Sequence, residues 1–168
     1  MDRAKGLGLR ALSLIALVTA SLSAASGTSL IDAVKAGDRA AVRTLLSRTT
    51  VNNSEPDGMT ALHWAVRADD AETAALLIRA GANVSAANRY GVTPLSLAAT
   101  NGNAVITRAL IKAGASVNAV GPDGETVLMT AARAGNPDVV TALVEKGASV
   151  NATESWQGQP ASMRAVSP

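Results

Sequence analysis

The sequence contains one histidine, His63, and it is the first residue to consider for chemistry. Thr60 precedes it by three positions, and Asp69 and Asp70 follow it. A hydroxyl, an imidazole and a carboxylate are the groups that a nucleophilic hydrolase combines, because the imidazole withdraws the proton of the hydroxyl. His63 is therefore the candidate catalytic base, and a hydrolase that uses it is one hypothesis for function.

The residues around His63 recur at a fixed spacing. Thr60-Ala61-Leu62 returns as Thr93-Pro94-Leu95 and as Thr126-Val127-Leu128, each time 33 residues further on. Other residue types keep the same step: Gly58, Gly91, Gly124; Gly81, Gly114, Gly147; Ala65, Ala98, Ala131; Leu77, Leu110, Leu143; Val84, Val117, Val150. A period that holds small and large apolar residues together indicates a repeat protein, in which each unit buries its apolar face against its neighbours.

One copy, residues 90–122, predicts two short helices. Thr93 can cap the first helix and Pro94 suits its first position, so this helix is expected over 94–100. Asn103 then starts a second helix, which Gly114 ends in a left-handed conformation. The expected buried stripe of the second helix is Val105, Ile106, Ala109 and Leu110. Helices this short are marginal alone, so stacking must stabilise them.

The first 25 residues differ from the rest. Arg3, Lys5 and Arg10 precede the apolar stretch "ALSLIALVTA", and Ser23 and Ala25 fit the small-x-small rule of signal cleavage. We expect a secretory signal peptide over 1–25, cut after Ala25. The alternative is an uncut anchor, but the apolar run is shorter than the ~20 residues that span a bilayer. No stable membrane insertion is expected after cleavage.

Composition excludes several function classes. Residues 26–168 contain 12 basic and 12 acidic residues, so a nucleic-acid partner has no electrostatic support. With one histidine and no cysteine, metal binding would depend on carboxylates. Asp69, Asp70 and Glu72 precede or open a predicted helix, where acidic residues interact favourably with the helix dipole. We therefore expect no metal site and no cofactor.

The three copies "GMTALHWAVRADDAETAALLIRAGANV", "GVTPLSLAATNGNAVITRALIKAGASV" and "GETVLMTAARAGNPDVVTALVEKGASV" resemble ankyrin repeats. The resemblance implies an all-α solenoid of stacked helix-turn-helix pairs with hairpin-like loops. Residues 26–155 would hold four copies, at about 28–56, 57–89, 90–122 and 123–155. The first copy keeps "LIDAVKAGDRAAVRTLL" but lacks the Thr-x-Leu opening.

The family also implies a structural role for His63, as a partner of the threonine at the helix start. Ser96 and Met129 replace the histidine in the other copies while the threonine is retained. A bond that can be omitted in two copies is more easily explained as structural than as catalytic. This interpretation is preferred, and the chain is expected not to be an enzyme.

The C-terminal segment 156–168 reads as a partial or degenerate repeat. Gly158, Pro160 and Ala165 begin another opening, but Ser162 stands where a buried leucine belongs. A terminal repeat needs a polar outer face to cover the core of its neighbour. We therefore expect either a frayed end or one that another chain covers, which makes self-association through this end the second hypothesis.

Ankyrin arrays usually bind proteins along a strip of loop tips and first-helix faces, so the favoured function is a protein-binding module with a protein partner. Alanine richness and the signal segment favour a secreted or periplasmic location in a bacterial envelope. Positions on this strip that the fold does not need are the predicted contact residues. They are Met59, Arg67, Arg89, Tyr90, Val92, Thr100, Asn101, Asp123, Glu125 and Arg133.

Overall fold

A computed structural model describes residues 28–121 and 123–152 of the 168-residue chain. The predicted signal peptide and the segment 156–168 lie outside these residues. Within them the chain forms eight helices and no strand: α1 (Leu30–Lys35), α2 (Arg39–Leu46), α3 (Ala61–Arg67), α4 (Ala71–Arg79), α5 (Pro94–Asn101), α6 (Ala104–Lys112), α7 (Val127–Ala134) and α8 (Pro137–Glu145).

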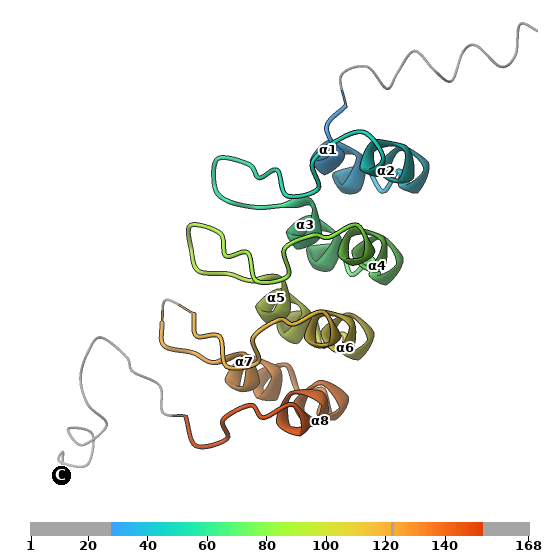
Figure 1. Cartoon of the computed structure of the whole chain (residues 1–168). Helices are drawn as coiled ribbons and strands as arrows, with labels where there is room; N and C mark the ends of the chain where they lie inside the picture. The colour runs from blue at the N-terminus through green and yellow to red at the C-terminus, as the bar shows by residue number, and fades with distance from the viewer. Residues whose placement is uncertain (1–27, 122, 153–168) are drawn as a thin grey trace, which may run out of the picture.

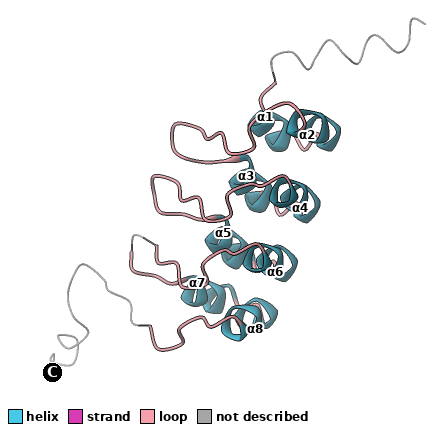
Figure 2. Cartoon of the chain, in the orientation of Figure 1, coloured by secondary structure: helices cyan, strands magenta, loops and turns pink. Residues whose placement is uncertain are grey.

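The helices are arranged as four stacked pairs (Figure 1). The first helices α1, α3, α5 and α7 contact one another in sequence, and so do the second helices α2, α4, α6 and α8. The loops between pairs project to the side opposite the second helices (Figure 2). The prediction of an all-α solenoid of helix pairs is confirmed.

Side-chain caps define where the helices begin. Thr60, Thr93 and Thr126 each accept a hydrogen bond from the backbone N–H three residues on, which starts a first helix. Asn103 caps α6 in the same way, as the sequence predicted. Gly114 follows α6 with φ of 95°, a left-handed conformation that glycine adopts without steric cost.

The core lies between the pairs and repeats with the sequence. Leu77, Leu110 and Leu143 are fully buried at equivalent positions of three second helices. One predicted core position is wrong, because Val105 is 67% exposed. Asn103 places the start of α6 so that Ile106 and Leu110, four residues apart, face the core. Val105, one residue earlier, lies about 100° around the helix, outside this stripe.

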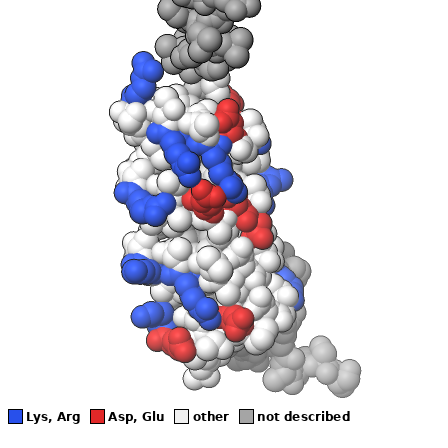
Figure 3. All heavy atoms as spheres, turned by 90° about the vertical axis from the view of Figure 1, so that its right-hand side faces the viewer, with Lys and Arg blue, Asp and Glu red and all other residues white. Residues whose placement is uncertain are grey.

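The exposed side of the second helices carries interspersed basic and acidic side chains (Figure 3). Arg39 reaches from the first repeat to Asp70 at 2.9 Å and Glu72 at 2.7 Å in the second, and Arg43 also contacts Glu72. These pairs are largely exposed, so each contributes little to stability. No helix among the described residues has the length and apolarity needed to cross a bilayer.

Candidate protein-binding groove

His63 is a structural residue of the second repeat. Its side chain is fully buried. Its Nδ1 lies 2.8 Å from the Thr60 hydroxyl oxygen and accepts the Thr60 backbone N–H at 3.2 Å. Its Nε2 lies 3.1 Å from the carbonyl oxygen of Val92 in the next repeat. The ring thus joins the start of α3 to the following loop.

These contacts define the protonation state of His63. A carbonyl oxygen only accepts, so Nε2 carries the hydrogen, while Nδ1 must be bare to accept from Thr60. Burial lowers the pKa of His63 from its ordinary value, and bonds to the carbonyls of Val92 and Ala86 offset part of this shift. The neutral ring is held on both nitrogens and is closed to solvent, which argues against a role as a base.

Among residues 28–121 and 123–152, no cluster of three or more histidine, cysteine or acidic side chains could hold a metal ion. Asp70 instead caps α4 by accepting the Thr73 N–H, and its carboxylate also binds Arg39. Glu72 lies in the first turn of α4, as the dipole argument anticipated. These acidic residues therefore have structural partners.

A groove of about 450 Å³ opens between the third and fourth repeats. Its floor is formed by α5 and α7, and its walls are the loops that lead into them. The lining residues are Tyr90, Gly91, Val92, Thr93, Ser96, Leu97, Thr100, Ala119, Val120, Gly121, Asp123, Glu125, Val127, Thr130 and Arg133.

The groove arises from side-chain size at one repeated position. In the second repeat this position holds Trp64, which packs against the core. In the third and fourth repeats, 33 and 66 residues on, it holds Leu97 and Thr130, and both line the groove. Two smaller side chains leave space that an indole occupies one repeat earlier.

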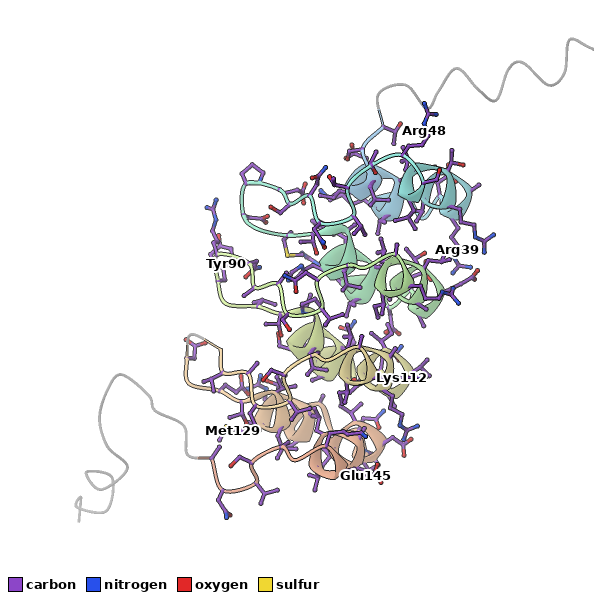
Figure 4. All side chains as sticks on the ribbon, in the orientation of Figure 1. Arg39, Arg48, Tyr90, Lys112, Met129 and Glu145 are labelled. Atoms are coloured by element: carbon purple, nitrogen blue, oxygen red, sulfur yellow. The ribbon has the colours of Figure 1, made fainter. Side chains whose placement is uncertain are left out.

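Six of the ten predicted contact residues lie together in this groove. They are Tyr90, Val92, Thr100, Asp123, Glu125 and Arg133. Tyr90 lies at a loop tip, on the side away from the second helices (Figure 4). It is 60% exposed, and Val120, from the next loop, is 58% exposed. Large exposed apolar groups of this kind suit a contact surface.

The other four predicted residues lie outside the groove. Arg67 stands over the Trp64 ring, with its guanidinium carbon 5.1 Å from the ring centroid. Arg89 donates to the Pro56 carbonyl at 2.8 Å, and Asn101 donates to the Val66 carbonyl at 2.8 Å. These two side chains therefore hold neighbouring repeats together.

Met59 corrects the sequence prediction most clearly. It was expected on the exposed strip, but it is buried, with 5% of its surface exposed. The Asn88 side chain donates to its sulfur at 3.4 Å from the next loop. Its long, flexible side chain fills space beneath that loop, as methionine does in many cores. Met59 therefore offers no surface to a partner.

Electrostatics at the groove are dominated by carboxylates. Glu125 and Arg133 form a two-point ion pair at 2.6 and 3.1 Å, and the glutamate side chain is 24% exposed against 69% for the arginine. Asp123 is exposed, and no hydrogen bond or ion pair engages it within the described part of the chain.

Sequence reasoning missed the groove floor. Ser96, Leu97, Val127 and Thr130 were not among the predicted contacts, yet they determine its depth. The signal was present in the repeat alignment, as the fall in side-chain volume from Trp64 through Leu97 to Thr130. Exposure alone does not reveal it, because Val127 is buried at 2% exposure.

Comparison with protein families agrees with this architecture. Residues 13–88, 30–121 and 76–154 match the family model of ankyrin repeats in three overlapping copies. The chain belongs to the ankyrin-repeat family, whose repeats indicate a protein–protein interaction module. No curated protein matches the sequence.

Proposed function

We propose that this chain is a non-catalytic, secreted or periplasmic module that binds a segment of a partner protein in the groove between its third and fourth repeats. The observation that supports this most directly is the groove itself, with Tyr90 and Val120 exposed at its mouth. Exposed aromatic side chains are frequent anchors of protein interfaces.

The size of the groove suits a segment rather than a flat protein surface. Ligand pockets are typically about 300–1,000 Å³ and are mostly apolar with a few polar groups. The groove falls within this range at about 450 Å³. Val92, Leu97 and Val127 supply apolar walls, while Asp123 and Glu125 supply charge. A few consecutive side chains of a partner would fill it.

The non-catalytic assignment is supported by His63. Its ring is buried, neutral and bonded on both nitrogens. A base must reach the proton that it removes, and this ring contacts no open space. We expect a His63→Ser variant, which copies the third repeat, to bind its partner as the native chain does.

Site-specific photo-crosslinking tests the position of binding. Tyr90 is replaced by p-benzoylphenylalanine, and the residue 26–168 protein is exposed to an envelope extract of its host. The matched control carries the same crosslinker at Val105, which is 67% exposed on α6 and lies outside the groove.

We expect a discrete crosslinked species from position 90 and none of that mass from position 105. A Leu97→Trp change in the position-90 protein should abolish it, because the indole fills the groove. Equal crosslinking from both positions, or crosslinking that survives Leu97→Trp, would show that the groove is not the site.

The proposed location depends on residues 1–25, which lie outside the described residues. Its support is the basic start, the short apolar stretch and the small residues before Ala25. Mass spectrometry of the protein from its host should find an N-terminus at Ser26 in the envelope fraction. An intact N-terminus in the cytosol would contradict the proposal.

A second candidate function, self-association, is favoured by the last described repeat. Val144 is 43% exposed and Val150 is 65% exposed, whereas Val84, the counterpart of Val150 two repeats earlier, is 9% exposed. Ala132 is exposed, while its counterpart Ala99 is fully buried by the following repeat. A second copy of this chain could cover these side chains end to end.

Sedimentation velocity over a range of concentrations tests this second candidate. Self-association through this end predicts a concentration-dependent dimer that a Val150→Glu change removes and a Val105→Glu change retains. A monomer at all concentrations, with and without residues 156–168, would exclude the assembly role. A monomer that dimerises only when 156–168 are deleted would show that this segment covers the end.

A further inference from the structure

The hydroxyl groups on the groove floor have no proton to offer a ligand. Ser96 donates to the Thr93 carbonyl at 2.8 Å, Thr100 donates to the Ser96 carbonyl at 2.9 Å, and Thr130 donates to the Thr126 carbonyl at 3.3 Å. A hydroxyl carries one hydrogen and two lone pairs. These three side chains therefore present acceptors to the groove.

The wall formed by residues 90–92 has the same character. The backbone N–H groups of Tyr90 and Val92 both donate to the Asn88 side-chain oxygen at 2.9 Å. The N–H of Gly91 donates to the Asn88 carbonyl, also at 2.9 Å. All three amides of this wall are used within the loop, so none is available to bind an acceptor on a partner.

The charged groups complete this pattern. Asp123 and Glu125 line the groove with a single basic residue, Arg133. Both nitrogens of the Arg133 fork are directed at Glu125. Arg89 lies outside the lining, held by the Pro56 carbonyl. The exposed carboxylate of Asp123 is thus the charged group most available to a ligand.

Resting on the proposed groove function, we infer that the partner segment carries an arginine or lysine next to an apolar side chain. The cation brings the donors that the groove lacks and lies against Asp123. Its stem contacts the exposed ring of Tyr90, and the apolar neighbour enters the space above Leu97. Arginine fits better than lysine, because its planar group stacks on aromatic rings and donates five hydrogens.

Selection from a library of random displayed dodecapeptides on the immobilised residue 26–168 protein tests this specificity. The expected result is enrichment of sequences with arginine or lysine directly beside leucine, isoleucine, valine or an aromatic residue. Parallel selection uses the Leu97→Trp protein, whose groove is filled. If that variant does not fold by circular dichroism, Thr130→Trp replaces it.

The best enriched peptide is then compared with a version in which citrulline replaces arginine, using fluorescence anisotropy. Citrulline keeps the shape and removes the charge, so affinity should fall about fivefold or more. Asp123→Asn should weaken the arginine peptide roughly two- to fivefold, the effect of one exposed ion pair. Glu145→Gln, the same charge change on α8, should leave affinity unaltered.

Each outcome separates this inference from the proposed function. Acidic or neutral sequences that fail on the filled variant would overturn the basic specificity while keeping the groove as the site. Sequences that bind the filled variant equally would overturn both. Failure to enrich any sequence would also count against both, and equal affinity of the citrulline peptide would overturn the inference alone.

Discussion

The concave side of the protein has two unlike openings, one around Trp64 and one between the third and fourth repeats. The Trp64 ring lies between Lys35 and Arg67, whose cationic groups are 4.2 and 5.1 Å from its centroid. Its Nε1 donates to Glu55 at 2.6 Å. Every polar and aromatic surface there has a partner within the chain.

The opening between the third and fourth repeats has the same backbone plan but smaller side chains. Leu97 and Thr130 occupy the positions that correspond to Trp64, and they leave the groove of about 450 Å³. No ion pair crosses between these two repeats in the described residues, whereas Arg39 and Arg43 cross between the first two. Binding capacity in this array therefore comes from truncating one repeated side chain.

Removing Trp64 should have the largest effect on stability. A fully buried aromatic changed to alanine costs roughly 3–5 kcal/mol, and for the half-buried Trp64→Ala we expect about 2 kcal/mol. Urea unfolding followed by circular dichroism measures this loss. Tyr90→Ala is the control, and its free energy of unfolding should stay within about 0.5 kcal/mol of the native value. A similar loss in both variants would contradict the contrast between the two openings.

Acidification should destabilise the second repeat through His63. Because its folded pKa lies below its unfolded value of about 6.5, the unfolded chain binds more protons. This contribution is complete above pH 6.5 and declines as the pH falls below it. Thermal melting from pH 8 to pH 5 should show the decline in the native chain and a smaller one in His63→Ser. Equal slopes for the two proteins would show that the histidine is not buried in its neutral form.

Thr107 offers an opportunity to gain stability. It is fully buried, and its hydroxyl has no hydrogen-bond partner in the described structure. Ala74 and Val140 occupy the equivalent positions. Thr107→Val should raise the free energy of unfolding by about 1 kcal/mol, since it removes an unsatisfied buried group. Thr73→Val is the control in urea unfolding, and it should lose stability because the Thr73 hydroxyl donates to Asp70 at 2.7 Å.

Asp69 is expected to give the smallest effect. It has φ of 57°, while Gly37, Gly102 and Gly135 occupy the matching turns with φ of 68°, 67° and 76°. Asp69→Gly relieves the left-handed strain but loses the Asn103 hydrogen bond at 2.7 Å, so the net gain should be about 0.5 kcal/mol or less. Gly135→Asp should destabilise instead. A gain from that reverse change in the same melting assay would refute the strain argument.

The fold was predictable because every structural requirement is written into the 33-residue step. Threonine caps, helix-ending glycines and the buried leucines recur together, and they occupy the predicted places. The error at Val105 was a matter of phase. The spacing identified a stripe on α6, but the orientation of that stripe depends on which neighbour the helix packs against.

The contact surface was less predictable. Loop-tip positions such as Tyr90 and Asp123 were found because the fold does not need them. Met59 was assigned wrongly because its equivalents, Val92 and Glu125, do line the groove, whereas its longer side chain turns under Asn88. Asn101 bonds to the carbonyl of Val66, a contact between repeats that spacing within one copy cannot show.

Backbone amide chemical-shift mapping tests the central claim most directly. The ¹⁵N-labelled residue 26–168 protein is titrated with the partner segment that crosslinks at position 90, or with the best selected peptide. We predict that the largest shifts fall within 90–100 and 119–133, and that they disappear in Leu97→Trp. Largest shifts on α4, α6 and α8, or shifts that persist in the filled variant, would contradict the assignment of the groove.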